Sequence, residues 1–318
     1  MKKLLFVYNP RSGKGVLKAK VSDVVDIFVK AGYEVTIYPT QCYHDSYNKI
    51  LKLQEDYDLV VCSGGDGTID EVVTAMMQRE KKIPVGYIPT GTTNDFANSL
   101  HLPKDVLKAA DTAVNGSMFA CDVGSFNEDS FIYIAAFGLF TDVPYQTKQE
   151  VKNILGHLAY LLEGVKRLYH IPSYHIKVVH DGIEIEDDFM FGMITNSRSV
   201  GGFRNMIGKN VKFDDGVFEV TLIRKAVSVK ALQEIISALL NEKVNSEYMY
   251  TFKTGHITFE SEEEIPWTLD GECGGAHDKV CIQNEQKALQ IMVVPEEKAS
   301  LMECPETEEN LNQEKEQK

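Results

Sequence analysis

Short apolar runs alternate with helix-spaced apolar positions through roughly the first 120 residues. Four runs have the length and composition of strands covered on both faces, at Leu4–Tyr8, Tyr33–Tyr38, Asp58–Cys62 and Val85–Ile88. Helical spacing follows each run, at Val16–Lys30, Ser46–Gln54, Ile69–Gln78 and a segment that begins near Asp95. Repeated strand–turn–helix units predict a parallel sheet with right-handed crossovers.

Strand-like segments dominate the rest of the chain. They are Phe131–Ala136, Tyr174–Val179, Ile183–Phe189, Phe191–Thr195, Val217–Ile223 and His256–Phe259. Asp181-Gly182 separates two of them and is a strong hairpin signal. Helical spacing predicts helices at Val151–Tyr169 and at about Val229–Leu240. We therefore expect a parallel α/β domain followed by an antiparallel β domain with inserted helices.

The composition is that of a soluble globular protein, with 43% apolar and 25% charged residues among 318. Acids outnumber bases by 47 to 33, and the formal net charge of −14 argues against a protein that coats nucleic acid. Part of that charge lies in the acidic segment 296–318, which we expect to be solvated. No apolar run approaches the roughly 20 residues of a membrane-spanning helix. We expect a cytoplasmic protein without a transmembrane segment that can still visit a membrane surface.

The strongest chemical signal is the loop Gly64-Gly65-Asp66-Gly67-Thr68, between a predicted strand and a predicted helix. Glycines let phosphate oxygens approach backbone N–H groups, and the N-terminus of the following helix adds a partial positive charge. Asp66 would repel phosphate unless a cation lies between them, so the loop favours a Mg²⁺–nucleotide site over a plain turn. The sequence lacks the G-x-x-x-x-G-K-[ST] pattern of a Walker loop.

Two more loops are expected at the same edge of the sheet. Residues 9–13 follow the first strand and include Arg11, a cation that could contact phosphates. Residues 90–95 follow the fourth strand and offer hydroxyl groups and the Asp95 carboxylate. Taken singly, the first loop is more often only a turn, and Asp95 more often a first-turn acid of a helix. Because ligands of parallel sheets bind beyond the carboxyl ends of the strands, three such loops together predict one site.

Six stretches occur in the order in which one enzyme family has them: NPRSG (9–13), SGGDGTIDEV (63–72), PTGTTNDFA (89–97), CDVG (121–124), KFDDG (212–216) and LDGE (269–272). With these motifs the sequence resembles the bacterial diacylglycerol kinase-like lipid kinases, which are related to the diacylglycerol, sphingosine and ceramide kinases of eukaryotes. The resemblance implies an ATP-binding α/β domain at 1–125, rejoined by the segment at about 290–310. It also implies a β-sandwich-like lipid-substrate domain at 126–290, with the active site in the cleft between the domains. Residues 311–318 would be a disordered end of the tail.

The resemblance also implies site residues. ATP would be bound by Asn9, Pro10, Arg11, Ser12, Gly13, Thr40, Gly65, Asp66, Gly67, Thr68, Ile69, Asp70, Glu71 and Thr92. The catalytic Mg²⁺ would be held through waters by Asp66, Asp95 and Asp122. A second Mg²⁺ would be bound by Asp215 and by the carbonyl groups of Lys212 and Val217. Two departures are visible: the family usually has Asn where this chain has Asp70, and the acidic tail has no counterpart in the family.

The tripeptide Asp270-Gly271-Glu272 is where the resemblance implies the general base. An alcohol that attacks the γ-phosphorus of ATP needs a carboxylate to accept its proton, and the glycine lets the chain present two acids locally. Taken alone, the same tripeptide is a hairpin turn with exposed acids. The choice between Asp270 and Glu272 stays open.

The function implied by the resemblance is an ATP- and Mg²⁺-dependent kinase that phosphorylates a lipid hydroxyl group at a membrane surface. Diacylglycerol is the leading acceptor, and a homodimer is the family expectation. One alternative is an NAD kinase, which shares a GGDGT-type loop but differs at TGTTNDFA (90–97). Another is a non-catalytic regulator that binds nucleotide or lipid. The apolar stripe of Val151–Tyr169 is interpreted as helix packing, with a membrane-facing role as the alternative.

Overall fold

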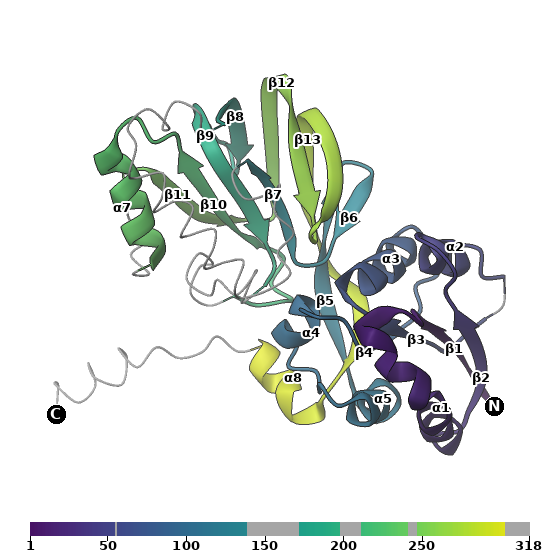
Figure 1. Cartoon of the computed structure of the whole chain (residues 1–318). Coiled ribbons are helices and arrows are strands. Elements are labelled where there is room, and N and C mark those ends of the chain that lie inside the picture. The colour runs from purple at the N-terminus through teal and green to yellow at the C-terminus, as the bar shows by residue number, and fades with distance from the viewer. Residues whose placement is uncertain (55, 139–171, 198–210, 241–246, 303–318) are drawn as a thin grey trace, which may run out of the picture.

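The computed structural model describes residues 1–54, 56–138, 172–197, 211–240 and 247–302 (Figure 1). An N-terminal α/β domain is followed by a C-terminal β-rich domain, as the sequence predicts. The predicted helix Val151–Tyr169 lies outside the described residues. Within these ranges, no helix combines the length and the hydropathy needed to span a membrane.

The N-terminal domain contains four parallel strands in the order β4-β3-β1-β2. Their bounds are Lys2–Tyr8 (β1), Tyr33–Pro39 (β2), Leu59–Gly64 (β3) and Val85–Pro89 (β4). Successive residues of β1 enter different cores: Leu4 and Phe6 pack on one face of the sheet, Leu5 and Val7 on the other, and all four are fully buried. The continuous apolar run therefore reflects a strand covered on both faces, as predicted.

Helices cover both faces of this sheet (Figure 1). They are the 3₁₀ helix η1 (Ser12–Ala19) and the α-helices α1 (Val21–Lys30), α2 (Asp45–Leu51), α3 (Asp66–Met77), α4 (Asp95–Ser99) and α5 (Val106–Asn115). The prediction of one helix from Val16 was wrong, because residues 12–19 form 3₁₀ turns and α1 begins only at Val21. Helix α3 begins three residues before the predicted Ile69, so Asp66 and Gly67 belong to its first turn.

The C-terminal domain is built from antiparallel strands. Its elements, with the strands that lead into it and out of it, are β5 (Ser117–Phe126), β6 (Asp129–Phe131), β7 (Ile134–Gly138), β8 (Tyr174–His180), β9 (Ile183–Thr195), β10 (Phe218–Arg224), α7 (Val229–Leu240), β11 (Met249–Thr254), β12 (His256–Leu269), β13 (Glu272–Val293) and α8 (Pro295–Met302). Trp267 packs at its centre, with ring centroids 4.8–5.2 Å from Phe126, Phe137 and Phe259.

Several predicted strands differ from the observed ones. The segment Phe131–Ala136 is divided between β6 and β7, because the backbone N–H groups of Ile132 and Tyr133 bond to a side chain and not to a neighbouring strand. The two strands predicted between 183 and 195 are one strand, β9. The hairpin at Asp181-Gly182 is confirmed, with φ of 47° and 78° as a two-residue type I′ turn requires.

Two long strands connect the domains. Strands β5 and β13 pair from Phe126↔Ile282 to Ser117↔Val293, with one irregularity between Glu285 and Leu289. Near its end β13 also pairs in parallel with β4, through Ile291↔Val85. Strand β13, which is the last strand of the described residues, thus extends the N-terminal sheet beside β4.

Candidate active site

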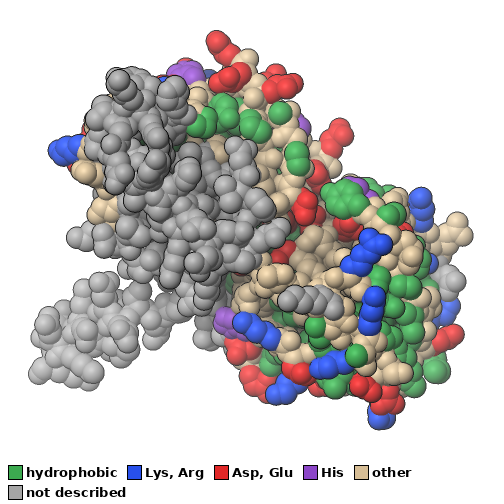
Figure 2. Space-filling model, viewed as in Figure 1, with side chains coloured by type: hydrophobic (Ala, Val, Ile, Leu, Met, Phe, Trp, Pro, Cys, Tyr) green, Lys and Arg blue, Asp and Glu red, His purple; other side chains and the backbone are tan. Residues whose placement is uncertain are grey.

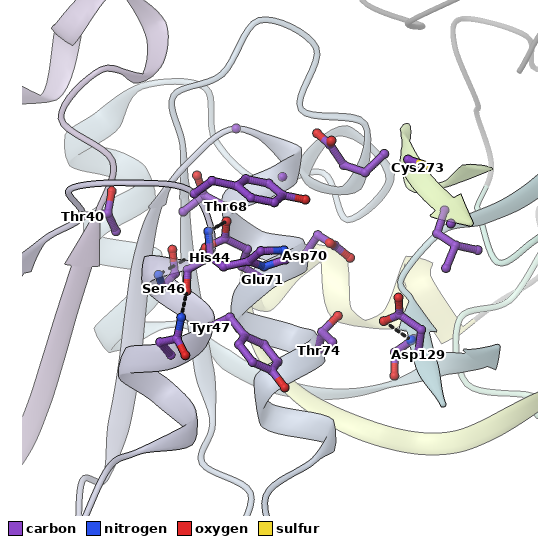
Figure 3. Close-up of a pocket in the computed structure, with 18 of the residues that line it drawn as sticks. Thr40, His44, Ser46, Tyr47, Thr68, Asp70, Glu71, Thr74, Asp129 and Cys273 are labelled. Carbon is purple, nitrogen blue, oxygen red and sulfur yellow. Dashed lines mark hydrogen bonds between the residues drawn. The ribbon is translucent and has the colours of Figure 1, made fainter. Parts of the chain in front are cut away.

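A cleft of about 1400 Å³ lies between the two domains (Figures 2 and 3). One wall comes from loops beyond the carboxyl ends of β1, β2 and β3, together with the first turns of α2 and α3. The other wall comes from the β5–β6 turn and from the hairpin between β12 and β13. The position agrees with the rule that ligands of parallel sheets bind at the carboxyl ends of the strands.

The three predicted loops meet at this edge of the sheet. The Thr90 hydroxyl group donates to the Ser12 hydroxyl oxygen at 3.2 Å, which joins the loops after β4 and β1. A Cβ atom on Gly91 would lie 2.5 Å from the Cα atom of Gly65, so these two loops touch backbone to backbone. Gly13 has φ of +55°, and a Cβ atom there would lie 2.0 Å from the Thr90 carbonyl oxygen. Glycine is required at these close approaches, and the predicted convergence is confirmed.

The N-terminus of α3 forms the floor of the cleft. Gly65 is its extended N-cap residue and makes no side-chain cap, so backbone N–H groups of the first turn are presented for an anion. Gly65, Gly67 and Thr68 line the cleft, and Arg11 is the one Lys or Arg side chain among the described residues that do so. The arrangement of glycines, helix N-terminus and cation suits the phosphates of a nucleotide.

Asp66 stands at the first position of α3. Its carboxylate accepts a hydrogen bond from the backbone N–H of Phe96 at 3.4 Å. Burial raises the pKa of Asp66, and backbone N–H donors from the start of α4 oppose that rise. The negative charge of Asp66 in turn contributes, after burial, to the raised pKa of the Tyr133 phenol. A partly buried carboxylate of this kind is stabilised when a cation binds beside it, so the residue fits a Mg²⁺ site.

Asp95 and Asp122 do not join Asp66 in a direct ligand set. Among the described residues, no group of three His, Cys, Asp or Glu side chains lies close enough to hold a metal ion directly. Asp95 is buried at the start of α4. The predicted network would hold Mg²⁺ by connecting these three acids through water molecules, and it stays a prediction.

Asp122 is instead tied to the predicted second metal loop. Its carboxylate accepts hydrogen bonds from the backbone N–H groups of Gly216 at 2.7 Å and Lys287 at 2.8 Å. Burial raises the pKa of Asp122, while these donors oppose the rise. In the same loop the Val217 N–H donates to the Asp215 carboxylate at 3.3 Å. The structure therefore brings Asp122 to the loop of Lys212, Asp215 and Val217, while metal binding there stays a prediction.

Asp270 and Glu272 have different environments. Asp270 and Gly271 form the two-residue turn between β12 and β13, with φ of 50° and 87°. The Asp270 side chain is buried, and its two oxygens accept the backbone N–H groups of Ile132, Tyr133 and Ile134 at 2.5, 3.0 and 2.9 Å. Glu272 is exposed and lines the cleft opposite Gly67. The tripeptide is thus a hairpin turn that also presents one acid to the cleft.

Other predicted ATP-binding residues are placed in different ways. Thr40 lines the cleft directly after β2, and its backbone N–H donates to the carbonyl oxygen of Tyr8 at 2.9 Å. Both carboxylate oxygens of Glu71 accept backbone N–H groups at the start of α2, from His44 at 2.8 Å and Ser46 at 3.2 Å (Figure 3). The Glu71 side chain therefore holds the β2–α2 loop in place. Five of the predicted residues do not line the cleft: Pro10, Gly13, Asp66, Ile69 and Thr92. The Ile69 side chain lies in the core.

Two segments of the cleft wall, apart from Thr40, were not predicted from the sequence. The β2–α2 loop contributes Tyr43 and His44, whose ring centroids are 3.9 Å apart, and the first turn of α2 contributes Tyr47. The β5–β6 turn and the start of β6 contribute residues 127–130. Neither segment carries a glycine motif. The β2–α2 loop could have been found by the rule that located the other three loops, since it also follows a parallel strand.

Comparisons with known proteins cover both domains. Residues 3–126 match the family model "Diacylglycerol kinase catalytic domain", and residues 139–293 match "YegS C-terminal NAD kinase beta sandwich-like domain". The chain is 35% identical over 278 residues to a diacylglycerol kinase of Bacillus subtilis (strain 168), covering 86% of this chain and 91% of the relative. It is 32% identical over 275 residues to a diacylglycerol kinase of Staphylococcus carnosus (strain TM300), covering 86% and 90%.

Solved structures have the same fold. A crystal structure from Bacillus anthracis str. Sterne matches with a TM-score of 0.75 at 26% identity, over 93% of this chain and 98% of the other. The crystal structure of a diacylglycerol kinase from the same strain matches with a TM-score of 0.71 at 23% identity, over the same shares of the two chains. The second likeness supports the fold alone.

Proposed function

This chain belongs to the diacylglycerol kinase catalytic domain family, and we propose that it transfers the γ-phosphoryl group of ATP to a hydroxyl group of a lipid. Diacylglycerol is the proposed acceptor, and phosphatidic acid the product. The observation that carries the proposal is that the exposed carboxylate of Glu272 lies next to Gly67 at the N-terminus of α3, in the lining of a cleft large enough for a nucleotide. This position supports a role for Glu272 as a proton acceptor beside a phosphate cradle.

Positioning supplies most of the proposed catalysis. The transition state of phosphoryl transfer is loose and spreads its charge over oxygen atoms, so the protein must orient the reactants and neutralise charge. Backbone N–H groups at the start of α3 would bind the phosphates, and Arg11 would add a positive charge at the mouth of the cleft. Tyr43 and His44 lie on the same wall, where their rings could contact the base of the nucleotide.

Mg²⁺ is proposed as the second requirement. Asp66 would hold it together with Asp95 and Asp122 through water, and the loop of Lys212, Asp215 and Val217 would hold a second ion. When bound, the metal neutralises phosphate charge that the acids of the cleft would otherwise repel. The support from this chain is that Asp66 is a partly buried carboxylate beside the phosphate cradle, with a raised pKa.

Glu272 is the proposed general base, and Asp270 the anchor of the turn that carries it. Glu272 is exposed to the cleft, whereas both oxygens of Asp270 are occupied by backbone N–H donors. Glu272 would accept the proton of the lipid hydroxyl group while the oxygen of that hydroxyl group forms a bond to the γ-phosphorus. The bond to the bridging oxygen then breaks and ADP leaves.

The acceptor would be reached at a membrane surface, so the proposal includes peripheral membrane association. A net charge of −14 repels anionic lipid, and we expect docking to use a local face together with salt or Mg²⁺. The homodimer expected from the family is retained as part of the proposal.

The test is phosphoryl transfer from labelled ATP with Mg²⁺, analysed by thin-layer chromatography. The acceptors are diacylglycerol, phosphatidylglycerol, a polyprenol, a sphingoid base and NAD. We expect labelled phosphatidic acid from diacylglycerol. NAD is an essential control because the C-terminal domain matches an NAD kinase-like family model. Product from NAD alone would replace the lipid kinase with an NAD kinase, and nucleotide binding without any product would leave a non-catalytic regulator.

A further inference from the structure

Asp70 lies opposite Asp270 across the domain boundary. Asp70 is in the second turn of α3, and its carboxyl group is within hydrogen-bonding reach of the Asp270 carboxyl group at the tip of the β12–β13 hairpin. Figure 3 shows Asp70 pointing from α3 toward the wall of the cleft that carries Asp129 and Cys273. The contact therefore joins an N-terminal helix to a C-terminal turn.

The hydrogen bonds around the two acids show which one accepts. Burial raises the pKa of Asp270 to about 6, and the three backbone N–H groups that donate to its oxygens oppose that rise and stabilise the ionised form. No N–H or O–H group of the described residues donates to the buried Oδ1 atom of Asp70. Two ionised carboxylates in contact would repel each other, so the pair is stable when one proton lies between them. The donors around Asp270 place that proton on Asp70.

The surroundings favour a neutral Asp70. Burial raises the pKa of Asp70 well above its ordinary value, and the neighbouring charge of Asp270 raises it further. The other charges that act on it most strongly are also acids, Asp129 of β6 and Glu272 of β13. Two phenols face the same region, Tyr133 from the β6–β7 turn and Tyr43 from the β2–α2 loop, and burial raises the pKa of each. On α3 itself, the nearest acids in sequence are Glu71, which is bonded to the α2 N-terminus, and Asp66.

We propose that Asp70 is a positioning residue: its protonated carboxyl group donates a hydrogen bond to Asp270 and so holds the β12–β13 turn, with Glu272, over the phosphate loop. This inference rests on the proposed function. Glu272 is two residues from Asp270, and the Asp270 backbone is fixed in turn by its N–H bond to the Ile134 carbonyl oxygen at 2.9 Å and by the Tyr133 hydroxyl group, which donates to its carbonyl oxygen at 3.0 Å. The turn is rigid within its own domain, so the bond from Asp70 sets its distance from α3.

Ionisation of Asp70 breaks this link. The folded protein binds the proton of Asp70 more tightly than the unfolded chain, because the pKa is raised on folding. Its contribution to stability is therefore present at low pH and lost as pH rises through the folded-state pKa. Asparagine at this position keeps an N–H donor for Asp270 and cannot ionise. Alanine removes the donor.

The experiment compares Asp70→Asn, Asp70→Ala and the wild-type protein, with Asp129→Asn as a matched control. Asp129 is exposed, and its replacement removes a nearby negative charge without removing the bond to Asp270. Thermal unfolding is followed from about pH 5 to pH 9 without nucleotide. We expect the unfolding temperature of the wild type to fall with pH relative to that of Asp70→Asn, and Asp129→Asn to keep the wild-type slope.

Kinetics give the second measurement. We expect Asp70→Ala to lower kcat by about 10- to 100-fold with little change in the KM for ATP, because the base is displaced and the phosphate cradle is not. Asp70→Asn should retain activity near neutral pH, and the alkaline limb of its kcat profile should move upward by about one pH unit or more.

Two results would overturn the proposal. One is a pH dependence of unfolding for Asp70→Asn that superimposes on that of the wild type, which would mean that Asp70 carries no extra proton. The other is a loss of kcat in Asp70→Asn as large as in Asp70→Ala. This result would mean that the hydrogen bond donated to Asp270 does not position the β12–β13 turn for catalysis. If no lipid is phosphorylated by any of these proteins, the proposed function fails, while the unfolding curves still decide the state of Asp70.

Discussion

The Oε1 atom of Glu272 lies 3.4 Å from the position that a Cβ atom would take on Gly67. The two residues belong to different domains, one to the first position of β13 and the other to the first turn of α3. This distance is too short for a γ-phosphoryl group to lie between the carboxylate and the phosphate cradle. The γ-phosphoryl group would have to bind beside them, and the attacking hydroxyl group would enter from the same side.

Glu272→Gln should lower kcat by about 100- to 10,000-fold, because the amide cannot accept the proton of the acceptor hydroxyl group. The unfolding temperature should stay within about 1 °C of the wild type, since the side chain is exposed. Activity assays and circular dichroism measure the two effects. Asp278→Asn is the control, an exposed acid of the same strand outside the cleft. Wild-type kcat in Glu272→Gln would reject this residue as the base.

Asp66→Asn should abolish turnover without unfolding the protein. Burial raises the pKa of Asp66, so its ionised form costs free energy in the nucleotide-free protein at neutral pH. The variant should unfold at the same temperature as the wild type or higher, yet lose the stabilisation that Mg²⁺ and ATP give the wild type. Asp23→Asn, an exposed first-turn acid of α1, should behave as wild type. A full thermal shift with Mg²⁺ and ATP in Asp66→Asn would contradict the assignment.

Gly91→Ala should weaken nucleotide binding more than Gly65→Ala. A methyl group on Gly91 would lie 2.5 Å from the Gly65 Cα atom, whereas one on Gly65 would lie 3.3 Å from the Gly91 Cα atom. In Gly91→Ala the backbones of the two loops must move apart, which should lower the free energy of unfolding by about 1–3 kcal/mol. Calorimetry with Mg²⁺ and ATP gives the affinities, and urea unfolding gives the stabilities. Equal effects of the two substitutions would show that the loop contact does not shape the cradle.

Glu219 lies outside the cleft lining, and Glu219→Gln should make the free energy of unfolding less dependent on pH. Glu219 is 4% exposed, and burial raises its pKa to about 7, although Lys253 at 2.7 Å opposes the rise. Its contribution to stability is complete at low pH and is lost as pH rises through about 7. Between pH 5.5 and pH 8 we expect the wild type to lose about 1–3 kcal/mol relative to the variant in urea unfolding.

The control for this prediction is Glu184→Gln. Glu184 also pairs with a lysine, Lys177 at 2.9 Å, but it is exposed. Its replacement should leave the pH dependence of unfolding unchanged. A wild-type slope in Glu219→Gln would mean that Glu219 ionises as readily in the folded protein as in the unfolded chain.

Local signals in the sequence were enough for the N-terminal sheet and for the phosphate loop. Strands such as β1 are buried on both faces, so their apolar runs are unambiguous. Glycines between them are required by contacts such as that of Gly91 with Gly65, and they mark the edge of the sheet where the loops meet. The hairpin at Asp181-Gly182 was found for the same reason, since few residues accept positive φ at both positions of a turn.

The environments of the acids could not be predicted in this way. The letters of Asp270-Gly271-Glu272 do not distinguish a buried acid from an exposed one. The difference is made by backbone N–H groups at 132–134, far away in the sequence, and by Asp70 on a helix of the other domain. The β12–β13 arms were also underestimated, because exposed residues such as Glu262–Glu264 obscure the alternation of a strand. Long-range pairing of this kind leaves little trace in a local window.

Strand β13 has a consequence for how the protein is made. Because Ile291 pairs with Val85, the sheet that carries the phosphate loop is completed only after almost the whole chain has left the ribosome. Contacts so distant in sequence form slowly. During synthesis the β4 edge of the N-terminal sheet therefore stays unpaired, and an unpaired edge strand can aggregate. A premature stop before β13 would therefore disable the first domain as thoroughly as the second.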